Sequence, residues 1–219
     1  MTTQMGAPFS AWLIGLLLLL GNPSSVGANG DHQEFPLGDV LLESGATLPN
    51  ATVVYVTYGA LNASRSNAIL LPSWYGADHH GYDSLIGPGK ALDPAEYFII
   101  ATDQFSNGLS SSPSNTPPPY SGADFPQIAV RDNVAATYRL VTEVFGIDRL
   151  AAIVGFSMGA QQALQWAVSH PGMVDAVVAY CGNDKEYPLS LNENFADGAA
   201  YWYWTVGVSG SKLTDCCAQ

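Results

Sequence analysis

The chain has 219 residues, of which 47% are hydrophobic and 12% are charged, and its formal net charge is −12. This length and apolar content suit one globular α/β domain with a sizeable buried core. The seven Lys and Arg residues are too few to form a basic patch, which argues against a nucleic-acid partner.

The N-terminus has the features of a secretory signal. An apolar run over residues 11–20 is followed by a polar break and by small residues that end at Ala28. The run is shorter than the roughly 20 residues of a membrane-spanning helix. We therefore expect a signal peptide over residues 1–28 and a secreted protein, with an uncleaved signal that anchors the chain to the membrane as the alternative. Asn50 and Asn62 begin Asn-X-Thr/Ser sequons and are the glycosylation sites expected of a secreted chain.

The strand patterns change along the chain. Residues 34–62 carry β-rich runs separated by turn residues, which predicts an antiparallel hairpin. Continuous apolar runs follow, as expected of parallel strands covered on both faces. They lie at residues 67–71, 97–102, 150–154 and 174–180. We expect helices between successive runs, the clearest over residues 128–145, so the sequence predicts a doubly wound, mostly parallel α/β sheet with an N-terminal antiparallel hairpin.

The residues from Gly155 to Gly159 read Gly-Phe-Ser-Met-Gly and fit the pattern G-x-S-x-G. An apolar strand pattern precedes them and a small-residue helical pattern follows, which is the setting of a nucleophile elbow. Glycines at these positions allow a sharp turn close to the neighbouring strand and helix. The pattern predicts Ser157 as a nucleophile and the backbone N–H of Met158 as a donor to a developing oxyanion. A tight strand-to-helix turn with an inert serine is the alternative.

The placement of cysteines gives no indication of a metal site. Cys181, Cys216 and Cys217 include no C-x-x-C pair, and no His/Cys cluster has the spacing of a ligand set. The odd number leaves at least one thiol unpaired or joined to another chain. We therefore expect no bound metal.

Several of these stretches together resemble homoserine O-acetyltransferase-like members of the α/β-hydrolase fold. The resemblance covers about residues 34–190. The stretches that carry it are residues 57–62, 67–70, 86–93, 97–100, 111–114 and 155–167. It implies Ser157 as the nucleophile, the N–H of Met158 as one oxyanion donor, and Trp74 or Tyr75 as the source of the second donor.

The sequence also departs from the transferase pattern. The elbow reads G-F-S-M-G-A-Q-Q, where the transferases typically have G-G-S-M-G-G-M-Q, and the loop after Leu71 reads Pro-Ser-Trp-Tyr-Gly. These differences are typical of the broader group, whose members need not use homoserine. The resemblance implies a small-molecule acyl donor, an alcohol or water as acceptor, and no cofactor, with acyl-CoA as co-substrate if the reaction is a transfer. A homo-oligomer is compatible with this reading.

The resemblance also implies a triad in which an acid and a histidine follow the nucleophile along the chain. The only histidine after Ser157 is His170, at the far end of the predicted helix, about 13 residues of about 1.5 Å each and so roughly 20 Å away. A general base must lie within about 3 Å of the hydroxyl. His79 and His80, expected to be exposed in a loop, are the alternative bases, and Asp184 is an acid candidate that is more simply a turn residue.

The C-terminal residues do not fit the family. From about residue 195 the sequence contains an aromatic cluster with no clear helical or strand pattern. We expect a partial α/β-hydrolase domain over residues 29–194, an atypical tail over residues 195–219, and a truncated chain that is weakly active or inactive. One alternative is a non-catalytic pseudoenzyme that associates through the unpaired edge of strand 174–180 or through the aromatic tail. Another is a small secreted serine hydrolase with an unusual base.

Overall fold

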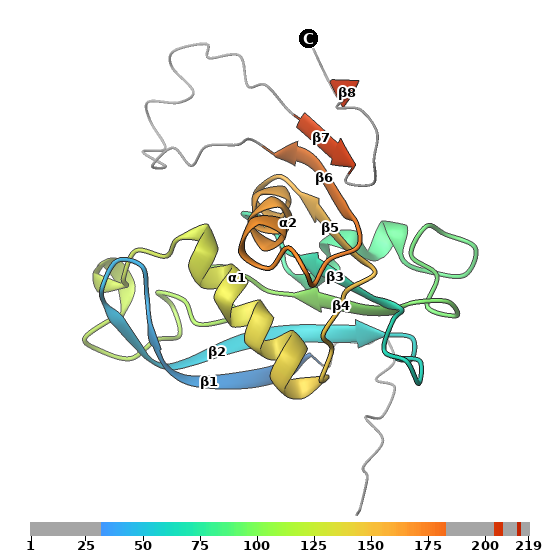
Figure 1. Ribbon diagram of the computed structural model, residues 1–219. Coiled ribbons are helices and arrows are strands. Elements are labelled where there is room, and N and C mark those ends of the chain that lie inside the picture. The colour runs from blue at the N-terminus through green and yellow to red at the C-terminus, as the bar shows by residue number, and fades with distance from the viewer. Residues whose placement is uncertain (1–31, 183–203, 208–213, 216–219) are drawn as a thin grey trace, which may run out of the picture.

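The computed structural model describes residues 32–182, 204–207 and 214–215 (Figure 1). The expected signal peptide, Asp184, and most of the tail, with Cys216 and Cys217, lie outside the described residues. The predictions made for those segments therefore stay predictions.

An eight-stranded sheet forms the centre of the domain, in the order β1-β2-β4-β3-β5-β6-β7-β8. The strands are β1 (Gln33–Leu41), β2 (Thr47–Tyr58), β3 (Ala68–Pro72), β4 (Phe98–Thr102), β5 (Ala152–Phe156), β6 (Val177–Gly182), β7 (Trp204–Gly207) and β8 (Thr214–Asp215). β2 is antiparallel to both β1 and β4. β3 is parallel to β4 and β5, and β5 is parallel to β6. The predicted mixed sheet with an antiparallel N-terminal hairpin is confirmed.

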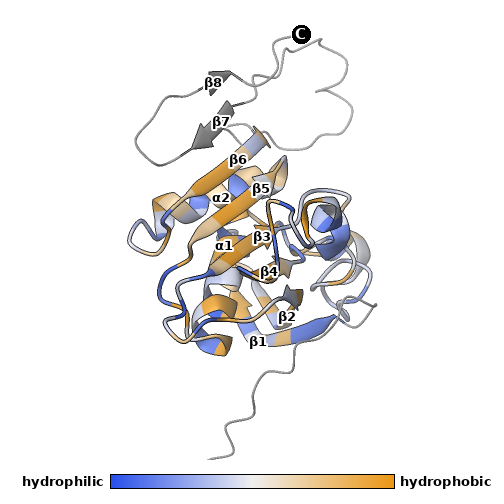
Figure 2. Ribbon diagram, turned by 90° about the vertical axis from the view of Figure 1, so that its right-hand side faces the viewer, coloured by the Kyte–Doolittle hydropathy of each residue, from blue (hydrophilic) through white to orange (hydrophobic). Residues whose placement is uncertain are grey.

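The central strands are buried on both faces. Every residue of β3 and β4 is buried, as their continuous apolar runs predict. Neighbouring residues face opposite sides: Leu70 packs into one apolar cluster, whereas Ile69 and Leu71 pack into the other. Figure 2 shows hydrophobic residues concentrated on these inner strands, while the outer strand β1 is more hydrophilic. The central strands therefore form a rigid layer with an apolar cluster on each face.

Two α-helices cover one face of the sheet (Figure 1). They are α1 (Val130–Arg139), which continues into the π-helical turn η3 (Leu140–Val144), and α2 (Met158–Ser169). The indole N–H of Trp166 in α2 donates to the hydroxyl of Thr137 in α1 at 3.0 Å, and both side chains are buried. The helix predicted over residues 128–145 is thus confirmed, with a π turn at its C-terminal end. None of the helices in the described ranges is long and apolar enough to cross a bilayer.

The connection between β3 and β4 differs from the sequence prediction. Instead of an α-helix it contains the 3₁₀ helix η1 (His79–Leu85), and a second 3₁₀ turn, η2 (Gly122–Asp124), lies further along the chain. The side chain of Asp78 caps η1 by accepting from the N–H of His80. The glycines and the proline that follow η1 disfavour a longer helix.

The predicted unpaired edge on β6 is wrong. β7 runs antiparallel to β6, with Val178 opposite Gly207 and Ala179 opposite Val206. The tail thus supplies a strand where the sequence showed no clear pattern, and its β-branched Thr205 and Val206 suit an extended backbone. Association through a free edge of β6 has no support in this structure.

Candidate active site

The turn between β5 and α2 has the geometry of a nucleophile elbow. Ser157 has φ 51° and ψ −119°, a conformation that side chains rarely adopt, and its N–H donates to the carbonyl of Tyr180 at 3.0 Å. A Cβ atom on Gly159 would lie 2.4 Å from the carbonyl oxygen of Pro72, so α2 can approach β3 only with glycine there. The turn therefore holds Ser157 at the carboxyl end of the sheet.

The start of α2 provides a free backbone donor. Met158 is the first residue of the helix, and its N–H has no acceptor among the described residues. The N–H groups of Ala160 and Gln161 bond to the carbonyl of Ser157 at 3.0 and 3.3 Å. The positive end of the helix dipole lies at this turn. An anion formed beside Ser157 would therefore meet an unused N–H donor and a favourable field.

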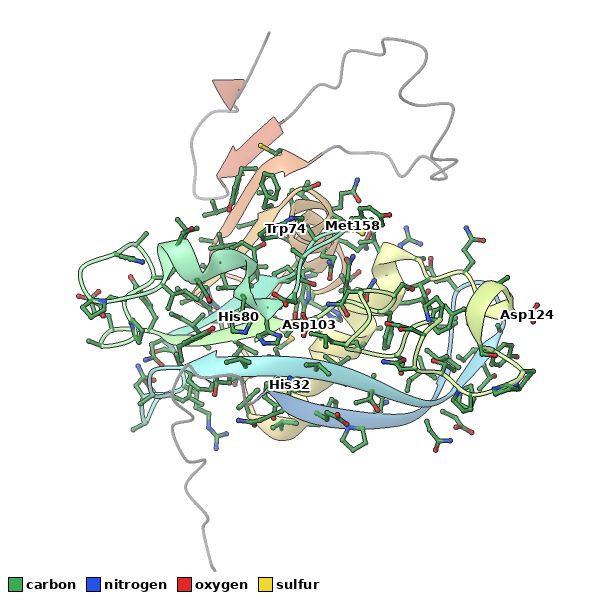
Figure 3. The ribbon with its side chains drawn as sticks, turned by 180° about the vertical axis from the view of Figure 1, so that it is seen from behind. His32, Trp74, His80, Asp103, Asp124 and Met158 are labelled. Atoms are coloured by element: carbon green, nitrogen blue, oxygen red, sulfur yellow. The ribbon has the colours of Figure 1, made fainter. Side chains whose placement is uncertain are left out.

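The loop that leaves β3, residues 73–75, reaches the elbow. The ring of Trp74 contacts the rings of Tyr82 and Phe156 edge-on, with both centroid distances 5.0 Å. Phe156 is the residue before Ser157, and Figure 3 labels Trp74 and Met158 at the same end of the sheet. The N–H of Trp74 has no acceptor within the described part of the chain. The N–H of Tyr75, the other candidate, likewise has no acceptor among the described residues, and this residue is 60% exposed.

Two polar side chains at the site were missed by sequence reasoning. The hydroxyl of Tyr82 donates to the carbonyl of Pro72 at 2.8 Å and accepts from the N–H of Phe156 at 3.0 Å. The amide of Gln162 donates to the carbonyl of Ser73 at 2.9 Å. Both side chains are buried, and burial raises the pKa of Tyr82, so its phenol stays protonated at neutral pH. No sequence motif predicts these contacts of Tyr82 and Gln162, because each hydrogen bond joins residues that are distant in sequence.

The expectation that His79 is exposed in a loop is wrong. The residue is 3% exposed, and its Nδ1 lies 2.7 Å from Oδ2 of Asp103, which follows β4. The other carboxylate oxygen of Asp103 accepts from Asn107 at 2.9 Å. The hydrogen bond to Asp103 raises the pKa of His79, although burial acts in the opposite direction. This contact explains how His79 can be buried, since the carboxylate of Asp103 satisfies the imidazole.

None of the described histidines hydrogen-bonds to the hydroxyl of Ser157. His170 lies at the C-terminal end of α2, where its ring stacks on Tyr138 at 4.1 Å. Burial lowers the pKa of His170. His80 is exposed and pairs with Asp83 at 2.9 Å, and in Figure 3 His80 is set apart from Met158. At this turn the structure thus places Ser157 beside the unused N–H of Met158, and no described histidine hydrogen-bonds to the serine hydroxyl.

The remaining predicted positions lie away from the elbow. Asn50 and Asn62 are exposed, and the side chain of Asn62 bonds to Ser64 and Ser66 within its own turn. Cys181 is a free, partly buried thiol. Within the described ranges, no group of three or more His, Cys, Asp and Glu side chains is placed to hold a metal ion.

Comparison with known proteins decides the family. The sequence profile described as the alpha/beta hydrolase fold matches residues 69–208. This chain belongs to the α/β-hydrolase fold family. The ethyl acetate hydrolase of Pseudomonas veronii is 43% identical over 155 residues, which cover 70% of this chain and 44% of that protein. The homoserine O-succinyltransferase of Leptothrix cholodnii is 39% identical over 181 residues, covering 74% of this chain and 48% of that protein.

A solved structure agrees with these similarities. An acetylester hydrolase from Corynebacterium glutamicum superposes on this α/β-hydrolase with a TM-score of 0.70 and 41% identity, covering 73% of this chain and 46% of that one. The resemblance to homoserine acyltransferases expected from the sequence is confirmed, and esterases are equally similar. The chain spans just under half the length of each of these three relatives.

Proposed function

We propose that Ser157 is the nucleophile of an acyl-transfer reaction on small esters. The observation that carries the proposal is the backbone of Ser157, held at φ 51° between a strand and a helix by close glycine contacts. Such strain persists where the surrounding structure enforces it, and it is concentrated at functional sites. An inert serine at an ordinary turn has no need of this conformation.

The reaction follows the chemistry of a serine acyl carrier. The hydroxyl oxygen of Ser157 bonds to the acyl carbon and releases its proton to solvent, while the former carbonyl oxygen becomes an oxyanion. The N–H groups of Met158 and Trp74, which have no acceptor among the described residues, are the proposed donors to that oxyanion. Collapse of the intermediate breaks the ester C–O bond, and the leaving alkoxide takes a proton from solvent to become the alcohol. The acyl group on Ser157 then passes to water or to a second alcohol, which releases its own proton to solvent.

Acetate esters of small alcohols are the proposed substrates, with water as the acceptor. The support comes from the similarity to an ethyl acetate hydrolase and an acetylester hydrolase. The departures of the elbow and of the Pro72–Tyr75 loop from the transferase pattern favour hydrolysis over transfer. Transfer from an acyl-CoA to homoserine is the alternative, supported by the similarity to the succinyltransferase.

We propose that the 219-residue chain is only weakly active. His170 stacks on Tyr138 at the far end of α2, and His79 is buried against Asp103; among the described residues, neither histidine hydrogen-bonds to the hydroxyl of Ser157. An oxyanion hole without the remaining triad supports about 10³- to 10⁴-fold acceleration over water. We expect this chain to accelerate ester hydrolysis over the uncatalysed reaction by about 10³- to 10⁴-fold.

The test is acetylation by p-nitrophenyl acetate, followed by peptide mass spectrometry of the full chain. We expect the acetyl group on Ser157 and not on the exposed Ser114, and no such adduct in Ser157→Ala. Acetylation of other serines alone would show that Ser157 is inert. Rapid multiple turnover that Ser157→Ala abolishes would contradict the proposed weak activity. Acetyl-CoA with homoserine, offered in parallel, distinguishes transfer from hydrolysis.

Secretion is also a proposal, supported by the apolar run over residues 11–20 and by exposed sequons at Asn50 and Asn62. Expression in a eukaryotic secretory host tests it. We expect the protein in the medium, with a mass that falls after glycosidase treatment. Retention of an unprocessed chain inside the cell would contradict it.

A further inference from the structure

Two buried side chains bind the carbonyl oxygens of consecutive residues beside the elbow. Tyr82, from η1, holds the carbonyl of Pro72, and Gln162, from α2, holds the carbonyl of Ser73. We propose that Tyr82 and Gln162 are positioning residues that aim the N–H of Trp74 at the oxyanion formed on Ser157. This inference rests on the proposed acyl transfer at Ser157.

The contact of Tyr82 replaces a missing part of the sheet. β3 and β5 pair directly only at Ile69 with Ala152 and at Leu70 with Ile153. Beyond these pairs the phenol oxygen of Tyr82 accepts from the N–H of Phe156 and donates to the carbonyl of Pro72, so it bridges the two strand ends. A parallel ladder would normally join such groups directly. The phenol therefore fixes the separation between the end of β3 and the elbow.

The contact of Gln162 fixes the orientation of one peptide group. In a trans peptide the carbonyl of one residue and the N–H of the next point in opposite directions. The carbonyl of Ser73 points to the amide of Gln162, so the N–H of Trp74 points away from that amide. The same amide also donates to the side chain of Gln104 at 3.1 Å, which restricts its rotation.

The remaining polar groups of Ser73 are also engaged. Its N–H donates to the carbonyl of Thr102 at 2.9 Å, and its hydroxyl accepts from the N–H of Gln104 at 2.9 Å. Ser73 is 1% exposed, so rotation of its peptide would leave buried groups unpaired. The N–H of Trp74 is the next donor along the chain, and it has no acceptor in the described structure. A loop whose polar groups are bonded as far as Ser73 holds the N–H of Trp74, the first free donor after it, in a preorganised position.

Gln162 also couples this loop to the elbow. It lies on α2, the helix that begins with Met158. The same helix therefore carries the proposed donor of Met158 and, through Gln162, holds the peptide group that contains the N–H of Trp74. Small misplacements of such donors reduce rates strongly, by about 10²-fold for a shift of about 1 Å. An ordinary buried glutamine would contribute only to stability.

The first test compares acetylation rates of Ser157 in full-length variants. Gln162→Met and Tyr82→Phe keep most of the side-chain volume but remove the donor to each carbonyl. We expect the limiting rate to fall about 10- to 100-fold, with little change in the half-saturating ester concentration, because the donor acts on the oxyanion and not on the bound ester. Gln165→Met, which removes an exposed bond to Ser169 on the same helix, and Tyr97→Phe are the matched controls and should react like the parent chain.

A pH dependence separates positioning from general damage. Gln162→Glu places a carboxyl group against the carbonyl of Ser73, which it can bind only when protonated. We therefore expect the rate of this variant, relative to the parent chain, to recover as pH falls. A merely structural role predicts that the rate changes only in step with the folded fraction, which circular dichroism measures at each pH. Equal limiting rates in the parent chain, Gln162→Met and Tyr82→Phe would overturn the proposal.

The amide resonance of Trp74 decides the point without turnover. In ¹⁵N-labelled protein we expect it to shift in Gln162→Met and Tyr82→Phe but not in Gln165→Met or Tyr97→Phe. If the parent chain is never acetylated on Ser157, the proposed function fails, while this resonance still reports whether the loop is held. If the Trp74 amide resonance is unchanged in both Gln162→Met and Tyr82→Phe, the positioning role is contradicted even in an active chain.

Discussion

A Cβ atom added to Gly155 would lie 2.1 Å from the carbonyl oxygen of Gly159. The two glycines flank Ser157, so the end of β5 and the first turn of α2 approach more closely than any side chain permits. The obstructing atom belongs to the backbone and cannot move aside without displacing the helix. The close approach of β5 and α2 at the elbow therefore requires glycine at both positions that flank the turn.

The first prediction concerns Gly155→Ala. We expect the free energy of unfolding to fall by about 2–3 kcal/mol, because the new methyl group overpacks the start of α2. Urea denaturation followed by circular dichroism measures the change. Gly172→Ala is the control, since a Cβ there meets nothing within 4 Å and should change stability little. Equal stability of the two variants would show that the elbow is less closely packed than the structure indicates.

The second prediction follows from the backbone of Ser157 itself. Ser157→Gly should be more stable than Ser157→Ala by about 1 kcal/mol, since glycine adopts φ 51° and ψ −119° without steric cost. Neither variant can accept an acyl group. The same pair of changes at the exposed Ser114 should give the opposite order, because glycine there only adds entropy to the unfolded chain. Thermal unfolding of the four variants decides the order.

The third prediction tests the contact between the two helices. Thr137→Val leaves the buried indole N–H of Trp166 without its acceptor, which should cost about 1–3 kcal/mol of unfolding free energy. Thr137→Ser keeps the hydroxyl and should lose less. Chemical denaturation of both variants provides the comparison. If the valine variant is as stable as the parent chain, the indole N–H has found another acceptor.

The fourth prediction is a pH dependence of stability at His79. The hydrogen bond to Asp103 raises its pKa above the ordinary value of 6.5, so the folded protein binds the proton more tightly than the unfolded chain. This contribution is fully present below that value and is lost as pH rises through the folded pKa. The free energy of unfolding should therefore fall with rising pH above about 6.5 in the parent chain and fall less in His79→Gln. Denaturation at a series of pH values measures both slopes.

His80→Gln is the control for that experiment. The side chain of His80 is 45% exposed and pairs with an exposed carboxylate, so its loss should change stability by less than about 0.5 kcal/mol. A parent-like slope is expected. If the dependence of stability on pH is weaker in His80→Gln and unchanged in His79→Gln, the prediction that His79 causes it is contradicted.

The parts of the fold that local sequence determines were predictable. The continuous apolar runs gave buried parallel strands, and the flanked Gly-x-Ser-x-Gly motif gave the turn at Ser157. Contacts between distant segments were not predictable. The phenol of Tyr82 meets a backbone group 74 residues away, and the amide of Gln162 meets one 89 residues away. The burial of His79 likewise depends on Asp103, which only the folded sheet brings beneath it.

The bridge made by Tyr82 has a consequence for protein engineering. The 25 residues between β3 and β4 look exchangeable, since they contain only a short 3₁₀ helix. One hydroxyl within them nevertheless completes the junction between β3 and β5. A graft that replaces this connection with one from a relative must bring an equivalent hydroxyl to the same point, or the chimera will join two correctly folded halves with a gap at the reacting end.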